Sequence, residues 1–207
     1  MAGRPRGVDD AVILRAAADV IGRVGPMGLT LAVVAREVGL VPGTLVQRFG
    51  SKRGLLLALA EQSAKNAEAL PGRVREGHAS ALQALEALMV EPMASMTTPE
   101  TYANHLAFLC IDLTDPQFRQ HALAMHENQT QAIEALLAES LLSGELRAGT
   151  DTAALARSVQ AITSGAGLLW ALDRRGTLEQ RIRQELDNVL SPHLPPSHGH
   201  HHDQEES

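Results

Sequence analysis

Apolar residues recur at steps of three and four along most of the chain, which is the spacing of helices that bury one face. The first such segment starts at Asp9 or Asp10, either of which can cap a helix, and is expected to end at Gly25-Pro26. Its apolar positions are Ile13, Ala17, Val20, Ile21 and Val24. The pattern therefore predicts a helix at the start of the chain.

Two short helices are expected next. Thr30 can cap the second helix, which should end at Gly39 because glycine takes a positive φ without steric penalty. Pro42 suits the first position of a third helix, since its missing N–H would have no intrahelical partner there. This third helix is predicted to run to about Phe49.

Longer helices are predicted for the rest of the chain. Their expected ranges are 52 to about 70, about 80–96, 99–113, 116–142, 151–174 and 177–190. The first of these is expected to follow a Ser51 cap and to stop at Pro71-Gly72. Residues 193–207 are rich in Pro, His, Asp and Glu, which cannot bury a core, so a disordered tail is expected there.

The composition favours an all-α fold. Alanine occurs 31 times and leucine 30 times, against 19 positions for isoleucine plus valine. Five aromatic residues are too few for an aromatic-rich sandwich or barrel. The length of 207 residues allows one large domain, or a small domain followed by a larger one.

The cysteine count and the hydropathy indicate the cellular compartment in which the protein is expected. A single cysteine, Cys110, excludes a disulfide framework and a multi-thiolate metal site within one chain, and it is expected to be a buried small hydrophobe. The longest apolar run, Gly165 to Leu172, is far below the roughly 20 residues that span a bilayer. The first six residues lack the apolar core of a secretory signal. We therefore expect a soluble cytoplasmic protein.

The charge is unevenly distributed. The net charge is −6, which by itself argues against a polyanionic partner. Residues 1–53, however, hold eight Lys or Arg against four Asp or Glu, a net charge of +4, and residues 54–207 carry −10. A basic head on an acidic body indicates that only the head meets nucleic acid, although a chance surface imbalance would look the same.

Residues 30–49 have the layout of a helix-turn-helix unit. Ala35 stands where the two helices must cross closely, and a bulky side chain there would push them apart. Gly39 follows four residues later, in the turn. In such a unit the second helix enters the major groove and presents its N-terminal and outward-facing residues to the base edges.

The amino-acid sequence of this segment resembles that of a known protein family. The residues that carry the resemblance are Leu29-Thr30, Ala35-Arg36-Glu37-Val38-Gly39, Gly43-Thr44-Leu45, Phe49, Ser51-Lys52 and Leu55-Leu56, with Ile13 to Ala17 before them. Over about residues 9–60 they are similar to the DNA-binding domain of TetR-family transcriptional regulators. The resemblance implies a homodimer that binds a near-palindromic operator, and a C-terminal helical domain that dimerises and accepts a small molecule. We accordingly expect domains at 1–53 and 54–192.

The resemblance also implies roles for single residues. Thr30, Thr44 and Lys52 match positions that contact phosphates in the family. Gln47 and Arg48 lie on the expected outward face of the third helix, where Gln can read adenine and Arg guanine. The candidate DNA-binding residues are Thr30, Pro42, Gly43, Thr44, Gln47, Arg48 and Lys52, with Arg4 and Arg6 of the basic arm. Ordinary solvated side chains are the alternative for the charged members.

Some positions depart from the family pattern. Val46 replaces the usual tyrosine, and Val41 replaces a polar residue that would cap the third helix. Ala32 and Val33 stand where polar or basic side chains often reach DNA. Base contacts are therefore expected to be few, with phosphate contacts proportionally more important. Val46 could instead touch a thymine methyl.

The helix expected at 151–174 must be covered on two sides, because its apolar residues form two stripes. One stripe is Leu155, Val159, Ile162, Ala166 and Leu169, and the other is Ala154, Ala161, Gly165 and Leu172. With the following helix at 177–190 it could form a four-helix interface between two copies of the chain. Packing within one chain is the alternative.

A ligand site is expected where polar residues interrupt apolar helices. The polar candidates are His105, Asp112, His121, His126, Asn128, Gln129 and Thr163, and the apolar ones are Phe108, Met125 and Trp170. Each could equally face solvent or be satisfied internally. The histidines at 198–202 could bind a transition metal, but a flexible run has no preset geometry, so neither a metal site nor a cofactor is expected.

These observations predict a ligand-responsive, dimeric transcriptional regulator, expected to be a repressor that a small molecule releases from its operator. The alternative is a small-molecule or metal-binding helical protein of the same fold that has lost operator binding. An enzyme is not expected, because the chain shows no nucleophile–base pairing, no phosphate loop and no paired-carboxylate signature.

Overall fold

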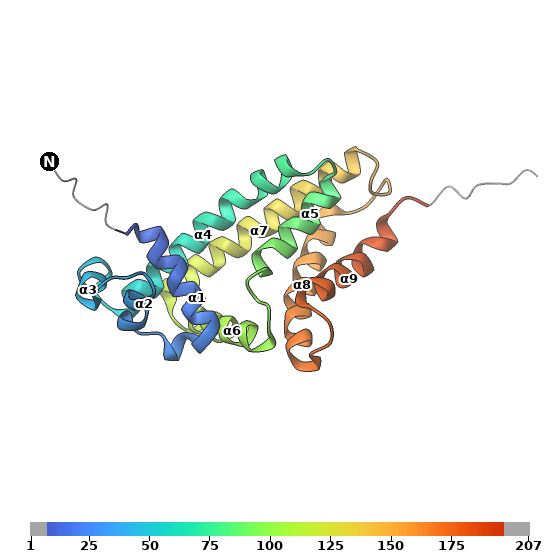
Figure 1. Ribbon diagram of the computed structural model, residues 1–207. Helices are drawn as coiled ribbons and strands as arrows, with labels where there is room; N and C mark the ends of the chain where they lie inside the picture. Colours follow the sequence, from blue (N-terminus) through green and yellow to red (C-terminus); the bar gives the residue numbers. More distant parts are fainter. Residues whose placement is uncertain (1–7, 197–207) are drawn as a thin grey trace, which may run out of the picture.

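The computed structural model describes residues 8–196, and the regular structure in that range is entirely helical. The helices are α1 (Asp10–Gly28), α2 (Leu31–Glu37), α3 (Pro42–Phe49), α4 (Lys52–Gly77), α5 (Ala81–Val90), α6 (Pro99–Thr114), α7 (Pro116–Leu142), α8 (Thr152–Asp173) and α9 (Leu178–Leu190), with short 3-10 turns at Glu91–Met93 and Ser191–His193 (Figure 1). The predicted all-α class is confirmed.

Two clusters of buried side chains divide the helices. The first joins α1, α2, α3 and the start of α4, and it includes Ile13, Leu45 and Leu55, each fully buried. Phe118, at the start of α7, closes this cluster. The cluster therefore holds the predicted helix-turn-helix unit together, and the first half of α4 is part of it.

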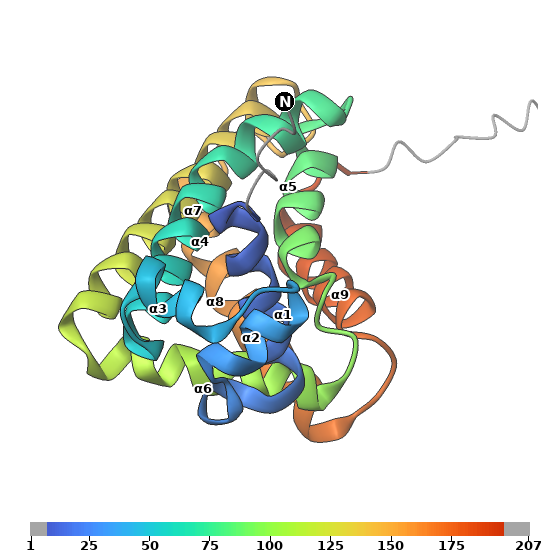
Figure 2. The same ribbon diagram turned by 60° about the vertical axis from the view of Figure 1, so that its left-hand side comes forward.

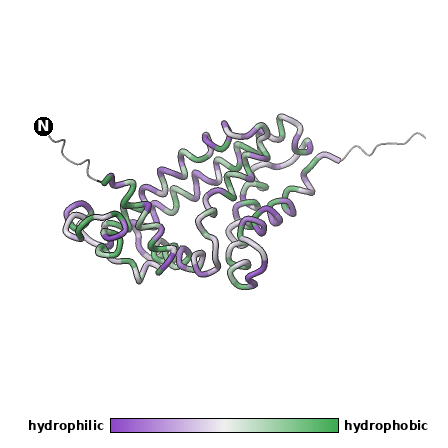
Figure 3. Tube along the Cα trace, in the orientation of Figure 1, coloured by the Kyte–Doolittle hydropathy of each residue, from purple (hydrophilic) through white to green (hydrophobic). Residues whose placement is uncertain are grey.

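The second cluster lies among the end of α4, α5, the second half of α7, α8 and α9. Helices α4 and α7 run side by side in both views (Figures 1 and 2). Hydrophobic and hydrophilic residues alternate along the long helices (Figure 3), as expected for helices packed on one side. Because α4 contributes to both clusters, the predicted division at residue 53 falls inside a continuous helix and stays a prediction.

Helix α1 bends where the sequence predicted that it would end. Gly25 adopts φ 70°, which leaves the helical region, but one further turn continues through Pro26 to Gly28. Pro26 has no N–H to donate to the carbonyl of Gly22. The side-chain amide Nδ2 of Asn104 on α6 donates to that carbonyl instead, at 2.9 Å. The bend in α1 is thereby tied to α6.

Three expectations need correction. Helix α4 does not stop at Pro71-Gly72 but continues to Gly77, because Leu70 and Val74 on either side of the proline are buried against the second cluster. Helix α5 ends at Val90 rather than near Met96, and a 3-10 turn containing Pro92 follows. Cys110 is exposed on α6, not buried.

No helix among residues 8–196 combines the length and the apolar character needed to cross a membrane.

Candidate nucleic-acid interface

The turn between α2 and α3 is fixed by local hydrogen bonds. The hydroxyl of Thr30 accepts from the backbone N–H of Val33 at 3.2 Å and so caps α2, as predicted. At the other end Gly39 has φ 67°, and the N–H of Leu40 donates to the carbonyl of Ala35 at 2.8 Å. Pro42 then occupies the first turn of α3, and Val41 provides no side-chain cap, again as predicted.

Close packing holds α3 in place. Ala35 and Leu45 are both fully buried, which is the close crossing of α2 and α3 that the sequence predicted. The turn into α4 is equally tight, since a Cβ on Gly54 would lie 2.0 Å from the carbonyl oxygen of Phe49. Gly54 was missed by the sequence analysis, because nothing in its neighbours signals how near that carbonyl comes.

The opposite face of α3 points away from the chain. Pro42, Gly43 and Gln47 are exposed, and Val46 retains 50% of its accessible surface. Val41, the N-cap residue just before the helix, is 68% exposed. A Cβ built on Gly43 meets no atom within 4 Å, so the fold itself does not require glycine there. The exposed face of α3 is therefore free to meet another molecule.

Two of the predicted DNA-contacting cations are engaged within the chain. The Nη1 atom of Arg48 forms an ion pair with Asp10 at 2.9 Å and donates to the carbonyl of Val8. Arg48 thereby joins the end of α3 to the start of α1, and its side chain is 30% exposed. The ammonium of Lys52 donates to the carbonyl of Met27 at 3.3 Å. Thr44 is half-buried on α3.

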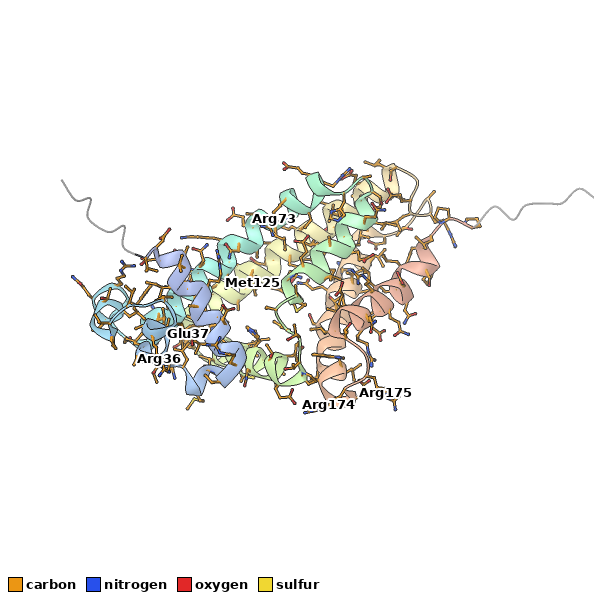
Figure 4. The ribbon with its side chains drawn as sticks, viewed as in Figure 1. Arg36, Glu37, Arg73, Met125, Arg174 and Arg175 are labelled. Carbon is orange, nitrogen blue, oxygen red and sulfur yellow. The ribbon has the colours of Figure 1, made fainter. Side chains whose placement is uncertain are left out.

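Other cations lie on α2 and at the start of α4. Arg36 on α2 is exposed, and its neighbour Glu37 pairs with Arg23 of α1 at 2.7 Å (Figure 4). Arg53 at the start of α4 binds Asp115 at 2.8 Å, which lowers the pKa of that carboxyl. Arg4 and Arg6 lie outside the described residues, as do the histidines at 198–202.

The candidate ligand residues are distributed over the C-terminal helices. The structure joins His126 of α7 to Gln160 of α8, whose Nε2 atom lies 3.0 Å from Nδ1 of His126. Thr130 donates to Oε1 of the same glutamine. Gln160 is 6% exposed. It was missed by the sequence analysis, which treated the buried stripes of α8 as apolar.

The remaining candidates do not gather at that network. Thr163 is buried, and its hydroxyl donates to Val159 of its own helix at 2.8 Å. Trp170 packs edge-on against Tyr102 and donates to the carbonyl of Gly176. Phe108 packs edge-on against Phe118.

The other predicted residues lie on α6 and α7. Met125 is half-buried on the middle of α7 (Figure 4), and His121, Asn128 and Gln129 are half-buried on the same helix. Asp112 lies on α6, and its side chain is outside the described part of the structure. Whether these residues contact a ligand stays a prediction.

His105 lines a separate groove between α1 and α6. The groove has a volume of about 290 Å³ and is lined by Ala18, Asp19, Gly22, Arg23, Ser95, Thr97, Thr101 and His105. Burial lowers the pKa of the His105 imidazole, and the charge of Asp19 opposes that shift. The groove lies between the helix-turn-helix domain and the rest of the chain.

A buried helix-turn-helix core, an outward-facing second helix and a larger helical part are the architecture of a helix-turn-helix DNA-binding protein. Residues 13–59 match the family model of the N-terminal domain of bacterial regulatory proteins, tetR family. Residues 13–59 therefore form a DNA-binding domain of the tetR-family type, as the resemblance predicted. None of the curated proteins matches the sequence.

Solved structures of similar fold cover nearly the whole chain. A protein of Saccharomonospora viridis, described as a transcriptional regulator and solved with choline, has a TM-score of 0.72 and 21% identity over 89% of this chain and 96% of its own. SmeT, the repressor of the Stenotrophomonas maltophilia multidrug efflux pump SmeDEF, has a TM-score of 0.66 and 20% identity over 92% and 93%. SmeT has also been solved with triclosan. PfmR from Thermus thermophilus, a TetR-family regulator, has a TM-score of 0.63 and 22% identity over 86% and 97%.

Proposed function

We propose that the protein is a homodimeric transcriptional repressor that binds a near-palindromic operator and is released by a small-molecule effector. The observation that carries this proposal is the free outward face of α3 in a helix-turn-helix unit whose other faces are buried. Phosphate contacts are assigned to Thr30, Thr44 and Lys52. Arg4 and Arg6 of the N-terminal segment and exposed Arg36 of α2 are assigned further contacts with the polyanion.

Helix α8 supports the dimer. Its buried residues face the second cluster, whereas Leu168, Leu169 and Leu172 remain 46%, 52% and 72% exposed on the other side. Exposed Ala161 lies two turns before Leu168. An apolar face of this kind is suited to a second copy, and a two-fold pairing of α8 would place two recognition helices on one duplex, about 34–36 Å apart.

The incomplete burial of side chains on α6 and at the start of α7 supports an effector site. None of the described side chains of α6 is fully buried, and Phe118 is the one buried residue in the first half of α7. The network of His126, Thr130 and Gln160 offers donors and acceptors beside this region. SmeT and the S. viridis protein bind triclosan and choline in their structures, which supports a small organic effector here.

Operator binding can be tested with the DNA upstream of the protein's own coding sequence, by fluorescence anisotropy over a range of salt concentrations. The full-length protein should bind as a dimer. Lys52→Ala should weaken binding to all duplexes and reduce the salt slope by about 0.9 for each phosphate that the variant no longer neutralises. Lys65→Ala is the matched control, because Lys65 is an exposed lysine of α4 that pairs with Glu61. Equal slopes for wild type and Lys52→Ala would remove the phosphate assignment.

A second function is favoured by the intrachain bonds of Arg48 and Lys52, which occupy cations expected to contact DNA. It is a small-molecule-binding protein of the same fold without operator binding. Failure to bind the upstream duplex or a random duplex pool at low salt would favour this function over the repressor.

A further inference from the structure

The exposed face of α3 carries an unusual combination of side chains. Val41 and Val46 are 68% and 50% exposed, although packing of α3 against its own domain is supplied by buried Leu45 and half-buried Phe49. Gln47, next to Val46, is the polar residue of this face and makes no hydrogen bond within the described residues. Packing within the chain therefore does not explain why these two exposed positions hold valine.

Arg48 is held toward α1 by one side of its guanidinium group. Reading guanine requires the guanidinium to present two N–H groups side by side to O6 and N7. In the structure Nη1 of Arg48 is committed to the Asp10 carboxylate, at 2.9 Å, and to the Val8 carbonyl. This pairing turns Arg48 toward α1, and the exposed side chains of α3 without such a partner among the described residues are Pro42, Val46 and Gln47.

The chemistry of the major groove then limits what α3 can read. The C5 methyl of thymine is the apolar group on the groove floor, and a valine side chain can recognise that group but has no donor or acceptor for the polar edges. Glutamine pairs with N6 and N7 of adenine. Val41 is the N-cap residue that precedes α3 and has an extended backbone, whereas Val46 lies inside the helix, so the two valines would meet different base pairs.

We propose that α3 reads A·T pairs, with Val46 and Val41 packed against thymine C5 methyl groups and Gln47 bonded to an adenine. This inference rests on the proposed operator binding and specifies the sequence chemistry of each half-site. The half-site facing α3 is A·T-rich, and its recognition depends on methyl groups rather than on an arginine–guanine pair.

The test begins by selecting duplexes that bind the full-length protein from a random-sequence library. Each thymine of one selected half-site is then replaced by deoxyuridine, which removes only the C5 methyl. For wild type, one or two of these replacements should weaken binding about fourfold each, the effect of burying one methyl-sized group. Replacements elsewhere in the duplex should have no effect.

Val46→Ala should lose this discrimination and bind the thymine and deoxyuridine duplexes with equal affinity at the sensitive position. Val24→Ala is the matched control, because Val24 is 51% exposed but lies on α1. The control should retain the wild-type preference. Both substitutions shorten an exposed side chain, so the melting temperatures of the two variants should match that of wild type.

The outcomes separate this inference from the function on which it rests. If no duplex is enriched and none binds at low salt, operator binding itself fails. If a duplex is enriched but no thymine methyl affects affinity, or if the positions facing α3 require G·C pairs, operator binding stands and readout by the valines is wrong.

Discussion

At the scale of single residues, Gly43 in α3 and Gly54 in the first turn of α4 should respond differently to a larger side chain. A Cβ at Gly54 would lie 2.0 Å from the Phe49 carbonyl oxygen, a backbone atom that cannot turn aside. We expect Gly54→Ala to lower the free energy of unfolding by about 3 kcal/mol, as overpacking against a rigid neighbour does. Urea unfolding followed by circular dichroism measures this loss.

Gly43→Ala is the companion variant. No atom of the chain lies within 4 Å of a Cβ at Gly43, and alanine favours a helix, so stability should stay within about 1 kcal/mol of wild type or rise. If Gly43 allows the backbone to approach DNA, affinity for the selected duplex should nevertheless fall. Unchanged affinity in a stable Gly43→Ala protein would contradict that role.

His105 makes stability depend on pH. Burial lowers its pKa in the folded state from the ordinary 6.5, against the opposing charge of Asp19, so the unfolded chain binds the proton more readily. Stability is therefore full above pH 6.5 and falls as the pH drops through the ordinary value toward the lowered one. His105→Gln should lose less stability than wild type between pH 7.5 and 5.5 in urea unfolding. Parallel losses in both proteins would assign the pH dependence to other groups.

For Arg48, the sequence predicts the position on α3 but not the ion pair that the side chain forms. Its position on α3 could be inferred from helical spacing, and so could the outward face on which it lies. Its partner Asp10 is 38 positions away, and the ion pair depends on how α1 packs across the end of α3. The exposure of Gln47 followed from spacing alone, because its side chain has no long-range partner in the described part of the chain.

At the scale of elements, a side-chain amide of α6 forms a hydrogen bond with the backbone at the bend of α1. Asn104→Ala removes the only side-chain donor described for the Gly22 carbonyl, and Pro26 has no N–H that could replace it. The substitution should therefore lower the free energy of unfolding by about 1–3 kcal/mol. Asn66→Ala, which removes an exposed hydrogen bond to Gln62, is the control and should change it by no more than about 0.5 kcal/mol. Equal effects of the two substitutions would show that the Gly22 bond contributes little.

Element boundaries were predictable where one residue decides them. Thr30, Ser51, Thr98 and Asp151 each accept a backbone N–H at a helix start, as their residue types predict. Pro71 was predicted to end the helix because proline disfavours a helix interior, which is also a local reason. Helix α4 nevertheless continues, because Leu70 and Val74 pack on the second cluster and Arg75 pairs with Glu139 of α7. Those contacts come from far along the chain, so no local pattern could reveal them.

At the scale of the whole molecule, the charge and the two exposed faces are distributed along the chain in the same way. The basic residues 1–53 include the free face of α3, and the acidic residues 54–207 include the apolar face of α8. DNA would attract the first part and repel the second, so the duplex is expected to meet only α1–α3 and the start of α4. The exposed leucines of α8 are then left for a partner of like composition, a second copy of the chain.

Leu172→Asp tests that pairing. Leu172 is 72% exposed in the single chain, so the substitution should leave the fold intact, whereas two carboxylates buried in a two-fold interface should weaken dimerisation on the order of hundredfold. Size-exclusion chromatography with light scattering should find wild type at twice the chain mass of 22.1 kDa and the variant near that single mass. Leu142→Asp alters a leucine that is 88% exposed on α7 and should remain dimeric. A dimeric Leu172→Asp protein would move the interface away from this end of α8, and a monomeric wild type would remove the dimer altogether.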